Sequence, residues 1–174
     1  AKYPIILAGE MISFEGGTNE LRTFATASGA GVVVSYRQQD IFPNDEEAYF
    51  GQLTLNRTPH LQEALIDCDL IINIGSRLDS ATSADYSLIR RDQKVVMAYP
   101  DAGVFSQWQV DVAICAHARP TMAAINEALS NFNPPAERLQ WRNSIHSKET
   151  LFAQPGAIQI KGDVDLAEVI TTFQ

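Results

Sequence analysis

Short apolar runs alternate along the chain with segments whose apolar residues recur at helical spacing. The runs are rich in Val and Ile and are apolar at consecutive positions, which is typical of strands buried on both faces of a sheet. The clearest of them ends at a glycine, in the stretch DLIINIGSRLD. We predict strands over 4–8, 31–36, 69–75, 94–99 and 110–116, with a further short apolar segment near 49–53.

Capping signals indicate helices between the apolar runs. Thr58 precedes Pro59, a pairing typical of a helix start, and Gly29 is a helix stop. We predict helices over 15–29, 58–67, 82–91, 119–132 and 136–152, and a last one after Asp163. Buried strands with helices between them indicate an α/β fold: a three-layer, doubly wound, Rossmann-like parallel sheet of about six strands.

In such a sheet, ligands bind beyond the carboxyl ends of the strands, so the residues that follow each strand are the candidate site. Gly75 allows close backbone approach, and Arg77 offers a planar fork of donors to phosphate or carboxylate. An ion pair of Arg77 with Asp79 or Asp101, which would only hold loops together, is the alternative that the residues leave open. The candidate binding residues are Gly9, Ser35, Tyr36, Gly75, Ser76, Arg77, Asp79 and Asp101.

The usual phosphate-binding motifs are absent from the sequence. The first strand is followed by GEMISFEGG in place of G-x-G-x-x-G, and Glu10 falls where a diphosphate would lie. The sequence contains no P-loop either, and its His, Cys and acidic residues do not show metal-ligand spacing. We expect His60, His117 and His146 to have ordinary structural roles.

Charge and composition narrow the class of protein further. The 174 residues are 45% hydrophobic and 20% charged, with a net charge of −8, as expected of one globular domain and not of a nucleic-acid binder. We expect no membrane partner. Cys68 and Cys115 lie beside apolar strands, so we expect both to be small core residues of a cytoplasmic protein. We expect a central domain over 1–155, cut from a longer polypeptide, with 156–174 as a linker and the start of the next domain.

Three segments in order carry a family resemblance: PIILAGEMI, LRTFATASGAGVVVSYRQQDIFPNDEEAYFGQL and RTPHLQEALIDCDLIINIGSRLD. Over about 3–133 they resemble the central domain of thiamine-diphosphate-dependent enzymes of the acetolactate synthase-like family. The resemblance implies a non-catalytic scaffold, inactive alone. The parent enzyme would be a transferase or lyase that forms or cleaves carbon–carbon bonds at 2-oxo acids. Its thiamine diphosphate and Mg²⁺ would be held by flanking domains of the same polypeptide, in a homo-oligomer.

The resemblance also bears on nucleotide binding, since some members hold FAD or ADP in this domain and others hold neither. Gly9, Ser35, Tyr36, Gly51, Gly75, Arg77, Asp79 and Asp101 fall at places that match FAD-binding relatives. The sequence departs from those relatives at 10–11, 53–57, 80–81 and 116–117. We therefore expect a vestigial nucleotide site and do not expect tightly bound FAD. A free-standing FAD-, NAD- or ADP-binding module of similar topology, or a pure interaction domain, is the alternative.

Overall fold

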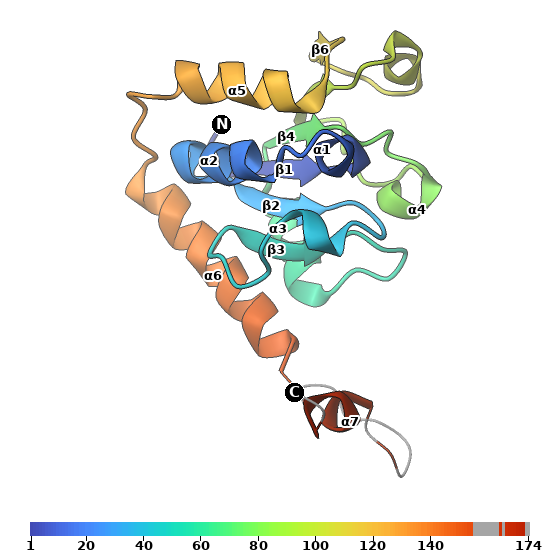
Figure 1. The fold of residues 1–174 in the computed structure, drawn as a ribbon, viewed down its shortest axis with the longest axis vertical. Helices are drawn as coiled ribbons and strands as arrows, with labels where there is room; N and C mark the ends of the chain where they lie inside the picture. Colours follow the sequence, from blue (N-terminus) through green and yellow to red (C-terminus); the bar gives the residue numbers. More distant parts are fainter. Residues whose placement is uncertain (155–163, 165, 173–174) are drawn as a thin grey trace.

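Six parallel strands form one sheet in the order β3-β2-β1-β4-β5-β6 in the computed structural model (Figure 1). The structure describes residues 1–154, 164 and 166–172. The order confirms the predicted doubly wound, Rossmann-like fold. The strands are β1 (Pro4–Ala8), β2 (Gly31–Val34), β3 (Tyr49–Gln52), β4 (Leu70–Ile74), β5 (Lys94–Ala98) and β6 (Val112–Ile114).

Helices cover both faces of the sheet and so make three layers (Figure 1). One face packs against α1 (Glu10–Phe14), α2 (Thr18–Ser28) and α5 (Ala118–Ala128). The other packs against α3 (Pro59–Asp67) and α6 (Ala136–Phe152). The remaining elements are α4 (Ser80–Ser83), α7 (Leu166–Thr172) and the 3₁₀ helices η1 (Gln39–Ile41) and η2 (Ala102–Gln107).

The apolar runs form strands because both of their faces are buried. In β1, Ile6 and Ala8 join the core under α2 and α5, whereas Ile5 and Leu7 join the core under α3 and α6. Trp141 of α6 is partly buried and packs against the rings of Phe50 and Tyr3. Among the described residues, no helix is long and apolar enough to cross a membrane.

Three local expectations differ from the structure. The helix expected over 15–29 is α2, which begins only at Thr18, after the left-handed Gly16 and Gly17, and a short helix that was not predicted, α1, precedes these glycines. The helix expected over 82–91 is only the single turn of α4. Cys68 is buried as expected, but Cys115 is exposed because β6 is the edge strand and is only partly covered. The domain boundary expected at 155–156 lies outside the described residues.

Candidate functional site

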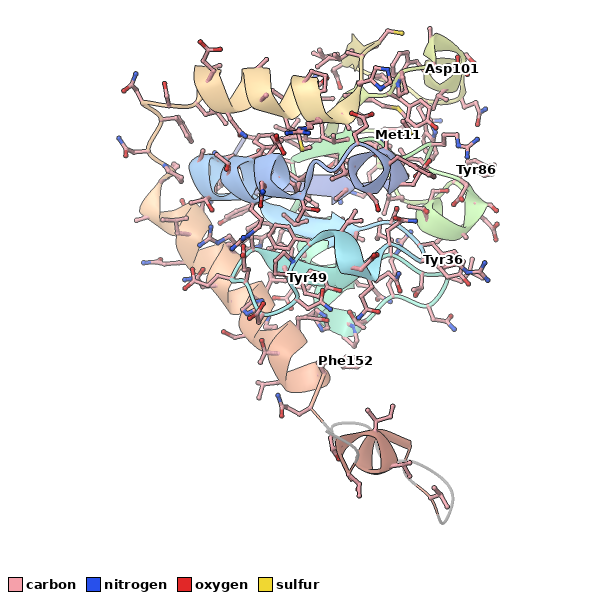
Figure 2. All side chains as sticks on the ribbon, in the orientation of Figure 1. Met11, Tyr36, Tyr49, Tyr86, Asp101 and Phe152 are labelled. Atoms are coloured by element: carbon pink, nitrogen blue, oxygen red, sulfur yellow. The ribbon has the colours of Figure 1, made fainter. Side chains whose placement is uncertain are left out.

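The chain leaves neighbouring strands toward opposite faces of the sheet where β1 lies beside β4. After β1 it enters α1 and α2 on one face, whereas after β4 its residue Leu78 packs into the core of the other face. Ligands bind at such a point in open parallel sheets. The candidates predicted from the sequence follow the strand ends and lie at this edge. Figure 2 shows two of them, Tyr36 and Asp101, on that side of the molecule, together with Met11 and Tyr86.

Backbone fills the point where β1 and β4 end. The N–H of Gly9 donates to the carbonyl of Ile74 at 2.9 Å, and the N–H of Met11 donates to the carbonyl of Gly75 at 3.1 Å. A Cβ on Gly9 would lie closer than 3.0 Å to the backbone of Gly75 and Ser76, and a Cβ on Gly75 would lie 2.8 Å from Cβ of Met11. The two glycines thus serve close packing and leave no room for a diphosphate between the two turns.

A cavity of about 640 Å³ lies beside this closed point. Five of the predicted residues line it: Ser35, Tyr36, Ser76, Arg77 and Asp79. Of the other three, Gly9 and Gly75 are not among its lining residues. Asp101 is also absent from the lining, because its Oδ1 caps η2 by accepting from the N–H of Gly103 at 2.8 Å. The remaining lining residues are Glu10, Arg37, Gln38, Ala81, Thr82, Tyr86, Val104 and Gln107.

Charge in the cavity is balanced. Nε of Arg77 lies 3.5 Å from Oε1 of Glu10, so its partner is neither of the two aspartates that the sequence suggested. Asp79 instead caps α4, where its Oδ1 accepts from the N–H of Thr82 at 2.8 Å. Burial raises the pKa of Tyr99; the charge of Arg77 opposes that rise and the carboxylate of Glu10 adds to it. With two arginines and two carboxylates in the lining, the cavity is a poor fit for a diphosphate.

The backbone around the cavity is unusual. All five described non-glycine residues with positive φ border it or its loops: Arg37, Leu78, Ala84, Asp85 and Tyr86. Such conformations are costly and cluster at ligand sites. The hydroxyl of Ser35 is buried and has no hydrogen-bond partner in the described part of the chain.

Several residues that line the cavity were not among the candidates predicted from the sequence. Arg37 follows Tyr36 at the end of a strand, so its position was a usable signal, and its guanidinium lies 5.0 Å from the centre of that ring. Tyr86 and Gln107 come from loops, and no motif in the sequence points to them.

Each of the three histidines contacts a residue of another segment. Nε2 of His60 lies 2.5 Å from Oε2 of Glu149 and ties α3 to α6. Nδ1 of His117 lies 3.0 Å from Oε1 of Glu15, and Nδ1 of His146 donates to the carbonyl of Tyr49 at 2.9 Å. Within the described ranges, no three His, Cys, Asp or Glu side chains gather in a way that could hold a metal ion.

The fold and its strand-end cavity define a Rossmann-like α/β domain, and comparison with known proteins places it in a family. The family model for the central domain of thiamine pyrophosphate (thiamine diphosphate) enzymes matches residues 1–125. The chain belongs to this family, and the matches do not support a free-standing nucleotide-binding module.

Relatives agree with this assignment. The chain is 32% identical over 163 residues to the acetolactate synthase large subunit of Corynebacterium glutamicum, covering 90% of this chain and 26% of that protein. It is 24% identical over 133 residues to a sulfoacetaldehyde acetyltransferase of Castellaniella defragrans, covering 74% of this chain and 22% of that protein. The chain therefore spans about a quarter of the length of the curated relatives it matches.

A solved structure shows the same fold. It is the X-ray structure assigned to a thiamin diphosphate-dependent enzyme of Mycobacterium smegmatis, with a TM-score of 0.62 and 18% identity. The match covers 78% of this chain and 26% of that one.

Proposed function

We propose that this chain is the non-catalytic central domain of a longer thiamine-diphosphate-dependent transferase or lyase that forms or cleaves carbon–carbon bonds at 2-oxo acids. The observation that carries the proposal is the family match over residues 1–125, in a chain whose relatives are about four times longer. The names of those relatives, an acetolactate synthase and an acetyltransferase, favour group transfer.

The residues of this domain do not fit thiamine diphosphate or Mg²⁺ themselves. The described part of the chain offers no cluster of metal-ligating side chains, and its switch point is closed by backbone. We assign both groups to flanking domains of the same polypeptide, in a cytoplasmic homo-oligomer. We place the domain at 1–155 and assign 156–174 to a linker and the start of the next domain.

Contacts between distant segments of the domain fit the role of a scaffold. The guanidinium of Arg138, at the start of α6, donates to the carbonyls of Ser28, Lys2 and Ala1 at 2.6, 3.2 and 2.5 Å. It thereby ties α6 to the segment that enters β1.

The cavity at the strand ends serves in this proposal as a vestigial nucleotide site. A volume of about 640 Å³ admits a molecule the size of a nucleotide. The balanced charges and the packing of Gly9 on Gly75 and Ser76 oppose the diphosphate of FAD. Absorbance of the purified chain in the flavin range, with mass spectrometry of the denatured supernatant, tests this point. We expect no stoichiometric flavin, and a clear flavin signal would contradict the assignment.

Activity measurements test the proposed function itself. The intact parent protein is supplied with pyruvate, Mg²⁺ and thiamine diphosphate, and product formation is followed with and without the cofactor. We expect cofactor-dependent turnover by the parent and none by the 174-residue chain. Turnover by the chain alone, or a parent that is indifferent to thiamine diphosphate, would contradict the proposal.

A further inference from the structure

Arg57 carries a charge that the described residues do not neutralise. Its Nη2 donates to the carbonyl of Ser83 at 3.2 Å, while its Nε is buried without a partner. No carboxylate of the described chain lies within ion-pair distance of Arg57. Partial burial lowers the pKa of Arg57, because desolvation disfavours the charged guanidinium. The guanidinium of Arg57 is thus only partly exposed and has no anionic partner in the described part of the chain.

Two other arginines of this domain have partners for their guanidinium groups. Arg138 is buried but donates to three backbone carbonyls. Arg90 donates to the carbonyls of Leu65 and Cys68 and pairs with Asp92 at 3.1 Å. Arg57 has neither arrangement, which makes its position a candidate for a bound anion.

A cavity of about 250 Å³ lies next to Arg57, between α3 and the segment 87–90. Its lining contains no acidic residue, and the positive charge of Arg90 is already met by Asp92. The apolar part of the lining combines the buried Leu65 and Leu88 with Ile66, whose exposed fraction is 69%. The remaining lining residues are Gln62 and Ser87.

The position of the arginine is fixed by its surroundings. Nε2 of Gln62 donates to the carbonyl of Arg57 at 3.2 Å and holds its backbone against α3. The bond from Arg57 to the carbonyl of Ser83 holds one edge of the guanidinium. A fixed guanidinium loses little freedom when it binds an anion, which favours binding.

We propose that this cavity binds a small organic carboxylate with a short aliphatic tail, and that the guanidinium of Arg57 takes the carboxylate. A planar donor fork matches a carboxylate, and Leu65, Ile66 and Leu88 accept the tail. A phosphate dianion fits less well, because it needs more donors than one free guanidinium supplies and has no apolar part. The cavity shares no lining residue with the one at the strand ends, so this proposal does not depend on nucleotide binding.

Titration of the 174-residue chain with 3-methylbutanoate tests the site, followed by the NMR signal of the Arg57 side-chain Nε–H. We expect saturable binding with a Kd of about 1 mM and a shift of that signal. Arg57→Gln is expected to weaken binding at least about tenfold. Arg91→Gln, at an exposed arginine outside the cavity, should change it less than about twofold.

Two further ligands test the site on the wild-type chain alone, so this part of the test does not depend on whether the variants fold. The neutral 3-methylbutanamide and inorganic phosphate should each bind the wild-type chain at least about tenfold more weakly. The proposal would be overturned if 3-methylbutanamide or phosphate bound as tightly as 3-methylbutanoate. It would also be overturned if 3-methylbutanoate caused no saturable shift of the Arg57 signal, or if Arg57→Gln bound it as tightly as the wild type. The same titration on the intact parent distinguishes the source of the anion. Loss of binding there would mean that a carboxylate of a flanking domain fills the cavity, and would overturn the assignment to a free ligand.

Discussion

Replacement of Gly9 by Ala tests the close packing at the switch point. Gly9 is extended, with φ −113° and ψ 179°, so alanine meets no backbone strain there and the cost is steric. The new Cβ would lie closer than 3.0 Å to backbone atoms of Gly75 and Ser76, which cannot rotate away. The turn after β1 must therefore move off β4, which lengthens the 3.1 Å bond from the N–H of Met11 to Gly75.

The magnitude follows from two contributions. Overpacking costs about 1–3 kcal/mol, and loss of a buried backbone hydrogen bond costs about 1–3 kcal/mol more. We expect Gly9→Ala to lower the free energy of unfolding by about 4 kcal/mol in total. With a slope of about 2 kcal/mol per molar urea, the midpoint of urea unfolding falls by about 2 M.

Urea unfolding followed by tryptophan fluorescence measures this change. Gly17→Ala is the matched control, since φ at Gly17 is −91° and the nearest atom to its added Cβ is the flexible tip of Met122 at 3.0 Å. We expect the control to change the free energy of unfolding by less than about 1 kcal/mol. A Gly9→Ala midpoint within about 0.5 M of the wild type would refute the packing argument.

Three other variants test the contacts that hold the fold. The carboxylate of Glu15 accepts from the N–H of Ala118 and Arg119; burial opposes ionisation, but these donors keep its pKa below the usual value. Glu15→Gln should lower the free energy of unfolding by about 2 kcal/mol at pH 7. The difference from the wild type should vanish as the pH falls through the pKa of Glu15, because the wild-type carboxylate is then protonated. A constant difference across the acid range would contradict this. Arg138→Met should cost about 3 kcal/mol in urea unfolding, because three carbonyls lose their donor; an unchanged midpoint would show that the contact is dispensable. Leu61→Ala, at a fully buried position of α3, should lower the calorimetric Tm through a loss of about 2–5 kcal/mol; a loss below about 1 kcal/mol would mean that the core closes over the gap.

The layers of the fold could be predicted because each strand is apolar at consecutive positions. Ile5 and Ile6 must be buried on opposite faces, which requires helices on both sides of the sheet. The exposure of residues at the edge of the sheet was harder to predict. Cys115 follows a run as apolar as the others, but β6 has a strand on only one side, and position in the sheet cannot be read from one segment.

The site could be predicted only where it depends on strand ends. Ser35, Tyr36 and Arg77 follow strands directly, so the topology alone brings them to one edge. Tyr86 reaches the cavity through left-handed backbone at three consecutive non-glycine residues, which local propensity disfavours and the sequence does not signal. The pairing of Arg77 with Glu10 likewise depends on how closely two turns approach, which is a property of the folded backbone.

Calorimetric titration with thiamine diphosphate and Mg²⁺, run in parallel on the 174-residue chain and on the intact parent protein, tests whether flanking domains hold both groups. We expect saturable binding by the parent and no binding heat with the isolated chain, because we assign the donor groups to other domains. Saturable binding by the chain alone, or none by the parent, would contradict this assignment.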